Sequence, residues 1–276
     1  MKNQLSEAQL ASYRENGFLV IENFLDSGEL AHWQKTTQEA VDQRLALTAA
    51  GVSSTETNRI LSNQHNPDSY YAQVFTQCIK LLETHDGMKE LMLDPRLGEL
   101  AATLAGVDGI RIWHDQALFK PPFGNPTGWH LDNPYWSFST RDTLSLWVAL
   151  DDATLGNGCM WYIPGSHKTA TWENAGIGQN MSDLFKLYPQ WREIEPVACP
   201  CPAGSAVFHN GLTAHGAGAN MTNKPRRAMT CGYMPDGATF NGQQNILPDD
   251  YFQSLKIGDV LNNDTLNPLV WKKAAP

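Results

Sequence analysis

The chain has 276 residues, 42% of them hydrophobic and 18% charged, so it is long enough to bury a sizeable core. Its formal net charge of −9 and pI of about 5.3 argue against nucleic acid or an anionic membrane as a partner. The N-terminus is polar, no apolar run reaches the length of a membrane span, and five irregularly spaced cysteines predict reduced thiols, so we expect a cytoplasmic enzyme.

The N-terminal part is predicted to begin with two helices around a strand. Ser6 and Gln9 form a capping box that predicts the start of the first helix, and Gly17 predicts its end. The apolar run 18–25 predicts a short strand, and the amphipathic segment 27–47 predicts a second helix. A third helical zone is expected from the seventies to about residue 106, with a break near residue 94, where a proline follows.

From about residue 110 the sequence consists of short runs rich in strand-forming residues, separated by Gly, Pro and Asn. These runs cover residues 110–119, 143–150, 159–164, 205–210 and 227–234. Strands at such spacing are typical of a sandwich or a barrel. No linker or repeat interrupts the chain, so we predict one domain over 1–276. It would have a helical part at about 1–106, a β core at about 107–236 and a tail at 237–276 that wraps the surface.

The segment GWHLDNPYW, residues 128–136, places a histidine and an aspartate two positions apart. In a strand His130 and Asp132 would project from the same face. One imidazole and one carboxylate make two thirds of the 2-His-1-carboxylate set that binds ferrous iron. A His-x-Asp pattern also occurs by chance, so the hypothesis needs a third ligand downstream.

Two histidines compete for that third place. His209 follows the apolar run SAVF and fits a packed or supporting role, whereas His215 precedes GAGAN, whose small residues leave room for a ligand. Eleven residues after His215 comes Arg226, far enough for a turn and a return strand. Its guanidinium group could pair with a carboxylate at the far end of the same pocket.

Several segments together resemble the phytanoyl-CoA dioxygenase family of Fe(II)/2-oxoglutarate oxygenases, in the family's order, from about Leu5 to Met234. They are EAQLASYRENGFLVIENFL, HLD, SLWVALDDATLGNGCMWYIPGSHK and HGAGANMTNKPRRA. The resemblance implies a mainly β fold with flanking helices, a double-stranded β-helix or jelly roll of the cupin kind. It also implies a dioxygenase that uses Fe(II), 2-oxoglutarate and O2 to oxidise a C–H bond, with release of succinate and CO2.

The resemblance also assigns residues. Iron would lie on His130, Asp132 and His215, and Arg226 would hold the distal carboxylate of 2-oxoglutarate. Further contacts to the cosubstrate are expected from Trp147, Gln116, Lys120 and Thr230. Thr230 enters as a substitute, because Ala228 stands where some related oxygenases carry a serine that binds 2-oxoglutarate.

The aromatic flank of the motif is predicted to wall the substrate pocket, although the same residues could simply be core of a β sandwich. They are Trp129, Tyr135, Trp136 and Phe138. The substrate is expected to be a small molecule without CoA, because 20 Lys and Arg stand against 29 acidic residues.

Three residues outside the motif are predicted to have structural roles only. His114 is predicted to be a satisfied strand histidine, and Cys199 and Cys201 to belong to a loop that enters a strand. Two other functions stay open, a non-enzymatic jelly-roll binding or sensor protein and a zinc hydrolase with the same three ligands. The sequence does not indicate the oligomeric state.

Overall fold

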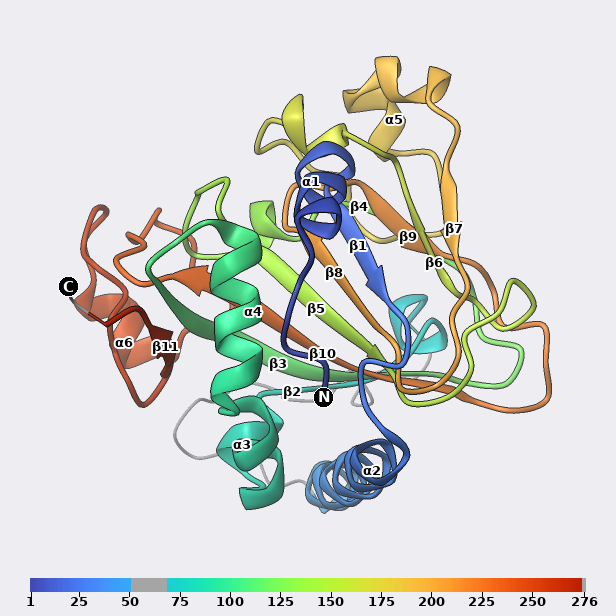
Figure 1. The fold of residues 1–276 in the computed structure, drawn as a ribbon, viewed down its shortest axis with the longest axis horizontal. Helices are drawn as coiled ribbons and strands as arrows, with labels where there is room; N and C mark the ends of the chain where they lie inside the picture. The colour runs from blue at the N-terminus through green and yellow to red at the C-terminus, as the bar shows by residue number, and fades with distance from the viewer. Residues whose placement is uncertain (51–68, 275–276) are drawn as a thin grey trace.

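Two antiparallel β-sheets form the centre of the molecule, and helices pack on the outer face of the larger one (Figure 1). The computed structural model describes residues 1–50 and 69–274. Along the larger sheet the described strands run in the order β1 (Phe18–Ile21), β8 (Ala206–Asn210), β5 (Leu144–Ala149), β10 (Arg226–Pro235), β3 (Gly109–Lys120) and β11 (Leu269–Lys272), and β2 (Thr76–Ile79) also pairs with β3. The smaller sheet has the order β4 (Thr127–His130), β9 (His215–Ala217), β6 (Met160–Tyr162) and β7 (Val197–Cys199). The predicted jelly roll is confirmed.

The helices of the described residues lie mostly before and after these strands. They are α1 (Glu7–Asn16), α2 (Ser27–Ala49), α3 (Asp86–Met92), α4 (Pro95–Ala105), α5 (Leu184–Leu187) and α6 (Asp249–Ser254). Short 3-10 turns, η2 (Tyr71–Gln73), η3 (Leu81–Glu83), η4 (Asn133–Tyr135), η5 (Ser166–Lys168) and η6 (Pro189–Glu193), connect them to the strands. None of the helices in the described ranges combines the length and apolar character needed to cross a membrane.

The predicted capping box at the first helix is confirmed. The Ser6 side chain accepts a hydrogen bond from the backbone N–H of Gln9, and the Gln9 side chain accepts one from the backbone N–H of Ser6. Gly17 ends α1 with a φ of 83°, in the left-handed region that favours glycine. A Cβ atom there would lie 2.4 Å from the ring of His167, so close packing also requires glycine.

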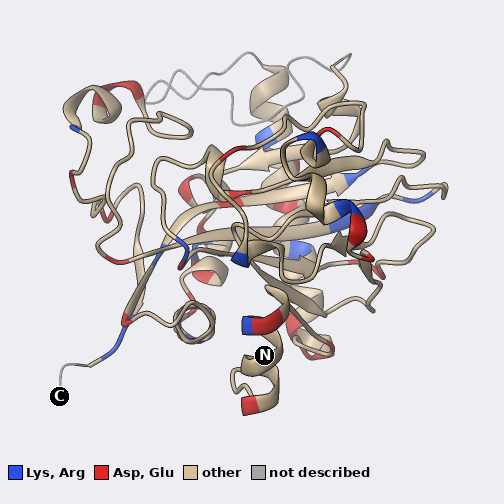
Figure 2. Ribbon diagram, turned by 90° about the horizontal axis from the view of Figure 1, so that it is seen from above, with Lys and Arg blue, Asp and Glu red and all other residues tan. Residues whose placement is uncertain are grey.

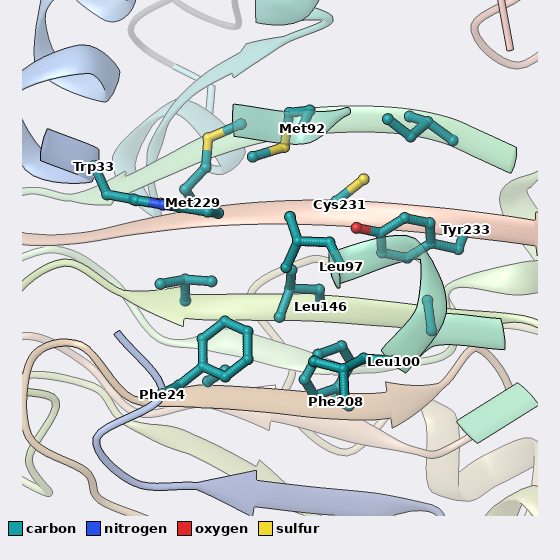
Figure 3. Close-up of a cluster of buried hydrophobic side chains, with 14 of the residues drawn as sticks. Phe24, Trp33, Met92, Leu97, Leu100, Leu146, Phe208, Met229, Cys231 and Tyr233 are labelled. Atoms are coloured by element: carbon teal, nitrogen blue, oxygen red, sulfur yellow. The ribbon is translucent and has the colours of Figure 1, made fainter. Parts of the chain in front are cut away.

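Side chains of β10 alternate between the helix-covered core and the space between the sheets. Met229, Cys231 and Tyr233 belong to the core cluster that includes Leu97 and Leu100 of α4 (Figure 3). Burial of each large apolar side chain of this kind stabilises the fold by about 1.5–3 kcal/mol. The residues between them on β10 therefore face the inside of the jelly roll.

The helical zone expected from the seventies starts later than predicted. Residues Thr76–Ile79 form β2, which pairs with β3 in antiparallel register, and regular helix begins only at Asp86. The hydrogen bonds offered by the edge of β3 outweigh the local preference of this segment. The predicted break is confirmed, since α4 starts at Pro95 behind the N-cap of Asp94.

The C-terminal tail does not only cover the surface, as predicted, but also contributes a strand and part of the cavity lining. Its strand β11 extends the larger sheet by pairing with β3, and α4 packs against it. Asn245 and Ile246, which lie before α6, reach the space between the sheets. The tail therefore closes one side of the interior.

Candidate active site

A cavity of about 550 Å³ lies between the two sheets. Described residues of both sheets, of the turns and of the tail line it. Among them are six groups able to bind a metal or an anion: His114, His130, Asp132, His209, His215 and Arg226.

His130 and His215 are brought together by strand pairing. Each lies at one end of its strand, His130 at the end of β4 and His215 at the start of β9, and the two are direct partners in the antiparallel register. Their rings lie 4.2 Å apart between centroids. The Nδ1 atoms lie 2.9 Å from the backbone carbonyls of Gly128 and Thr213, so each Nδ1–H donates to a carbonyl. This tautomer leaves both Nε2 lone pairs for a metal.

Asp132 completes the triad from a turn and not from the strand that the sequence predicted. β4 ends at His130, and Asp132 has helical backbone angles, φ −81° and ψ −52°, at the start of η4. Its Oδ1 atom lies 3.7 Å from His130 Nε2 and 3.6 Å from His215 Nε2. One ligand atom from each of the three residues falls within 4.8 Å of the others. This donor set is the one that ferrous iron takes with open positions left for other ligands.

The second oxygen of Asp132 is held by two side chains of the larger sheet. Ser145 Oγ donates to Asp132 Oδ2 at 2.6 Å, and His209 Nε2 lies 3.1 Å from the same atom. The other nitrogen of His209 lies 3.1 Å from the hydroxyl of Tyr162. His209, the alternative to His215 as third ligand in the sequence, thus contacts the triad carboxylate on its second oxygen.

Burial and the neighbouring histidines set the charge states of the triad. It lowers the pKa of His130 and of His215 to about 4, so both imidazoles are neutral at pH 7. Burial alone would raise the pKa of Asp132, but His215, His209 and His130 outweigh it, and the pKa falls well below its usual range. Neutral imidazoles and an ionised carboxylate are the forms that bind a metal.

Arg226 is a buried cation without a partner. Its side chain is 1% exposed, and its Nε, Nη1 and Nη2 atoms have no hydrogen-bond partner among the described residues. The guanidinium carbon lies 5.2 Å from the ring of Trp147. Burial lowers the pKa to about 10, which leaves the group charged at pH 7. Because an unpaired buried charge costs several kcal/mol, the site fits an anionic ligand with a carboxylate at this end.

The other residues predicted to contact the cosubstrate divide into two groups. Gln116 and Thr230 line the cavity beside Trp147, with Thr230 Oγ1 donating to the Gln116 carbonyl at 3.2 Å. Lys120 is not among the described lining residues. Its ammonium group donates to the Asn125 carbonyl at 2.5 Å, and burial lowers its pKa to about 7.

The four predicted pocket aromatics also divide. Tyr135 and Trp136 line the cavity. Trp129 points to the other side of β4 from His130, where its ring lies 5.7 Å from Phe185, and Phe138 packs against Trp113 at 5.2 Å. Strand alternation explains Trp129, because neighbours in a strand face opposite sides.

His114 is the residue whose place differs most from its expected role. The sequence predicted a satisfied strand histidine, but its Nδ1 atom is buried without a hydrogen-bond partner in the described part of the chain, and its ring lines the cavity. Ser145 was missed as a partner of Asp132, although its place two residues before Trp147 in a strand puts both side chains on one face. No local signal could have found Asn245.

The sequence profile of the phytanoyl-CoA dioxygenase family matches residues 13–228. The chain belongs to the phytanoyl-CoA dioxygenase family. Among its relatives, the probable alpha-ketoglutarate-dependent hypophosphite dioxygenase of Stutzerimonas stutzeri is 26% identical over 82% of this chain and 77% of its own length. The phytanoyl-CoA dioxygenase of Arabidopsis thaliana is 27% identical over 81% of this chain and 87% of its own.

Solved structures place this family member among the oxygenases. The non-haem alpha ketoglutarate dependent carbocyclase SnoK from nogalamycin biosynthesis has a TM-score of 0.75 and 27% identity, with 96% of both chains covered. The epimerase SnoN, solved with Fe3+, alpha ketoglutarate and nogalamycin RO, has a TM-score of 0.69 and 26% identity over 96% of this chain and 98% of its own. With the triad, these findings confirm the predicted class, a 2-oxoglutarate-dependent non-haem iron dioxygenase that uses O2.

Proposed function

We propose that this dioxygenase binds Fe(II) through His130, Asp132 and His215 and 2-oxoglutarate through Arg226, and that it oxidises a C–H bond of a small organic molecule. The observation that carries the assignment is the buried guanidinium group of Arg226, whose three nitrogens have no hydrogen-bond partner from the described residues, in a cavity that also holds the triad. A dicarboxylate that reaches from the metal to Arg226 accounts for both features. The two alternatives, a zinc hydrolase and a binding protein, leave this cation unexplained.

Two side chains, those of Ser145 and His209, orient the carboxylate of the triad. Ser145 and His209 hold Asp132 Oδ2, so that Oδ1 is the oxygen directed at the histidines. The carboxylate then offers one oxygen to a metal, which keeps further coordination positions open. Ferrous iron, 2-oxoglutarate and O2 supply the oxidising chemistry when bound, and the protein supplies position and a dry site.

The walls of the cavity support exclusion of water from that chemistry. Trp147 lies against Arg226, and Trp136 is 3% exposed. A low-dielectric wall strengthens the pairing between Arg226 and a carboxylate. Gln116 and Thr230 offer polar atoms on the same side of the cavity.

The test is a titration of 2-oxoglutarate into the anaerobic protein loaded with Fe(II). The chelate should give its weak visible charge-transfer band, and zinc-loaded protein should give none. An Arg226→Ala variant should need far more 2-oxoglutarate for the same band. Absence of the band in the wild type at millimolar 2-oxoglutarate would contradict the proposal.

We also propose that the chain acts as a single domain over 1–276, on a small molecule and without nucleic acid, in the cytoplasm. Strands from both ends of the chain, β1 and β11, join the larger sheet, which supports one folding unit. Lys and Arg lie on several separate elements with Asp and Glu among them (Figure 2), instead of forming the basic stripe that nucleic acid needs. All five cysteines are buried thiols outside any disulfide, as expected of a reducing compartment.

A further inference from the structure

We propose that the part of the cavity beside the triad on the β3 side takes an uncharged substrate, and that His114 hydrogen-bonds a hydroxyl, carbonyl or amide group of it. This inference rests on the proposed function, because it assigns the space next to the proposed iron site. It names both a substrate class and a positioning residue.

Strand register places His114 relative to the triad. His209, Ser145, Gly232 and His114 are successive partners across β8, β5, β10 and β3 and so form one row. His209 and Ser145 hold Asp132 at one end of that row. Because neighbouring strands lie about 4.8 Å apart, the backbone of His114 lies about 10 Å to the side of Ser145. A substrate beside the triad would span this distance.

The ring of Trp136 packs over Gly232 in the middle of the row, because the glycine has no side chain. A Cβ atom there would lie 3.0 Å from the ring of Trp136 and 3.6 Å from the ring of His114. The rings of His114 and Trp136 meet edge to face, with 6.1 Å between centroids. Close packing at Gly232 thus holds the indole of Trp136 beside His114, and both rings line the cavity.

Arg226 lies at a different place on the same face. It is six residues before Gly232 on β10, which corresponds to roughly 20 Å along a strand. The Arg226 end of the predicted 2-oxoglutarate subsite is therefore distant from the row of His114. His114 is not placed to bind the distal carboxylate of the cosubstrate.

The described residues that line the cavity include few charged side chains that could pair with a substrate. Among these residues Arg226 is the one Lys or Arg and Asp132 the one Asp or Glu. Burial lowers the pKa of His114 to about 4, so its ring is neutral at pH 7. An anion such as a phosphate or a phosphonate would lose its water there without gaining a second Lys or Arg partner from the described lining, which is costly. A neutral imidazole instead donates or accepts a hydrogen bond, according to its tautomer.

The first experiment compares matched compounds as substrates of the wild-type enzyme. A panel of uncharged cyclic alcohols and ketones is tested, together with the phosphate monoester of each alcohol, hypophosphite, methylphosphonate and an acyl-CoA. Release of succinate is measured with Fe(II), ascorbate and 2-oxoglutarate. At least one uncharged compound should stimulate succinate release tenfold or more, and its phosphate ester should be at least tenfold less effective. Stimulation by the anions alone, or by no member of the panel, would overturn the inference.

The second experiment tests His114 with the best uncharged compound. His114→Phe keeps a ring against Trp136 but removes both nitrogens, and it should raise KM about tenfold to a hundredfold with a smaller change in kcat. His114→Gln should recover part of the loss. Calorimetric titration of the compound into anaerobic protein with Fe(II) and 2-oxoglutarate should follow the same order. Equal affinity in wild type and His114→Phe would refute the role of His114.

Failure of this inference and failure of the proposed function give different results. If the proposed function fails, the charge-transfer band with 2-oxoglutarate is absent from the wild type. If only the inference fails, that band forms normally in wild type and in both His114 variants, while the substrate results contradict the expectation. The band in His114→Phe also shows that the variant is folded.

Discussion

Arg226 and Arg227 are neighbours in the chain, yet their side chains lie on opposite faces of β10. Arg226 is enclosed in the cavity without a hydrogen-bond partner among the described residues. Arg227 pairs with Asp151, with Nη2 and Oδ1 2.7 Å apart, and also contacts Gln38 of α2. Strand alternation therefore leaves one cation for a ligand and neutralises the other within the protein.

Replacement of Arg226 should weaken 2-oxoglutarate binding strongly. Loss of one partner of a buried charge pair costs roughly 2–5 kcal/mol, so the Kd of Arg226→Ala should rise about thirtyfold to several thousandfold. Arg226→Lys should fall between this variant and the wild type, because one ammonium cannot form the two parallel bonds of a guanidinium. Titration followed by the charge-transfer band measures each Kd.

Arg227→Ala is the matched control for that series. Its 2-oxoglutarate Kd should stay within about threefold of the wild type, although loss of the pair with Asp151 lowers stability by up to about 1 kcal/mol. A large effect at Arg227 with a small one at Arg226 would mean that the roles of the two faces are reversed.

Each proposed iron ligand should be essential for turnover. His130→Ala, Asp132→Ala and His215→Ala should each abolish substrate-dependent succinate formation, because each removes one of three donors within 4.8 Å. Asp132→Gly should still bind 2-oxoglutarate in the presence of iron, since Arg226 is unchanged. If Asp132→Gly bound no cosubstrate, the division of roles between the triad and Arg226 would be wrong.

Loss of His209 should affect iron binding more than chemistry. His209→Ala removes one of the two side chains that hold Asp132 Oδ2, and loss of such a supporting contact typically weakens metal binding by about 10–100-fold. With saturating Fe(II) the variant should keep much of its activity. Measuring succinate release at increasing Fe(II) distinguishes weaker iron binding from loss of an iron ligand. The control is His167→Ala, which should match the wild type, because the His167 ring contacts the Arg14 carbonyl away from the cavity.

His114 should make the metal-free protein sensitive to mild acid. Burial lowers its pKa from 6.5 to about 4, so between these values the unfolded chain binds a proton at this residue and the folded chain does not. Stability is therefore lost as the pH falls through this window. Between pH 7 and pH 5 the free energy of unfolding should drop by about 2 kcal/mol less in His114→Gln than in the wild type. Urea denaturation at both pH values measures the difference, and equal drops would contradict it.

Local rules were sufficient where neighbouring residues decide the structure. The capping box of Ser6 and Gln9, the left-handed stop at Gly17 and the helix start at Pro95 need contacts within a few residues only. Such rules failed at Thr76–Ile79, which pairs with the edge of β3, and at Asp132, which leaves the strand for a turn.

The sequence by itself determined which residues we propose for the chemistry of this protein, because the types and order of His130, Asp132, His215 and Arg226 are properties of the chain. Only the tertiary structure decided which groups serve that chemistry. Pairing between strands distant in sequence put His209 behind Asp132 and left Lys120 bonded to Asn125. The same pairing turned His114 into the cavity. These outcomes depend on register across strands, which no local pattern contains.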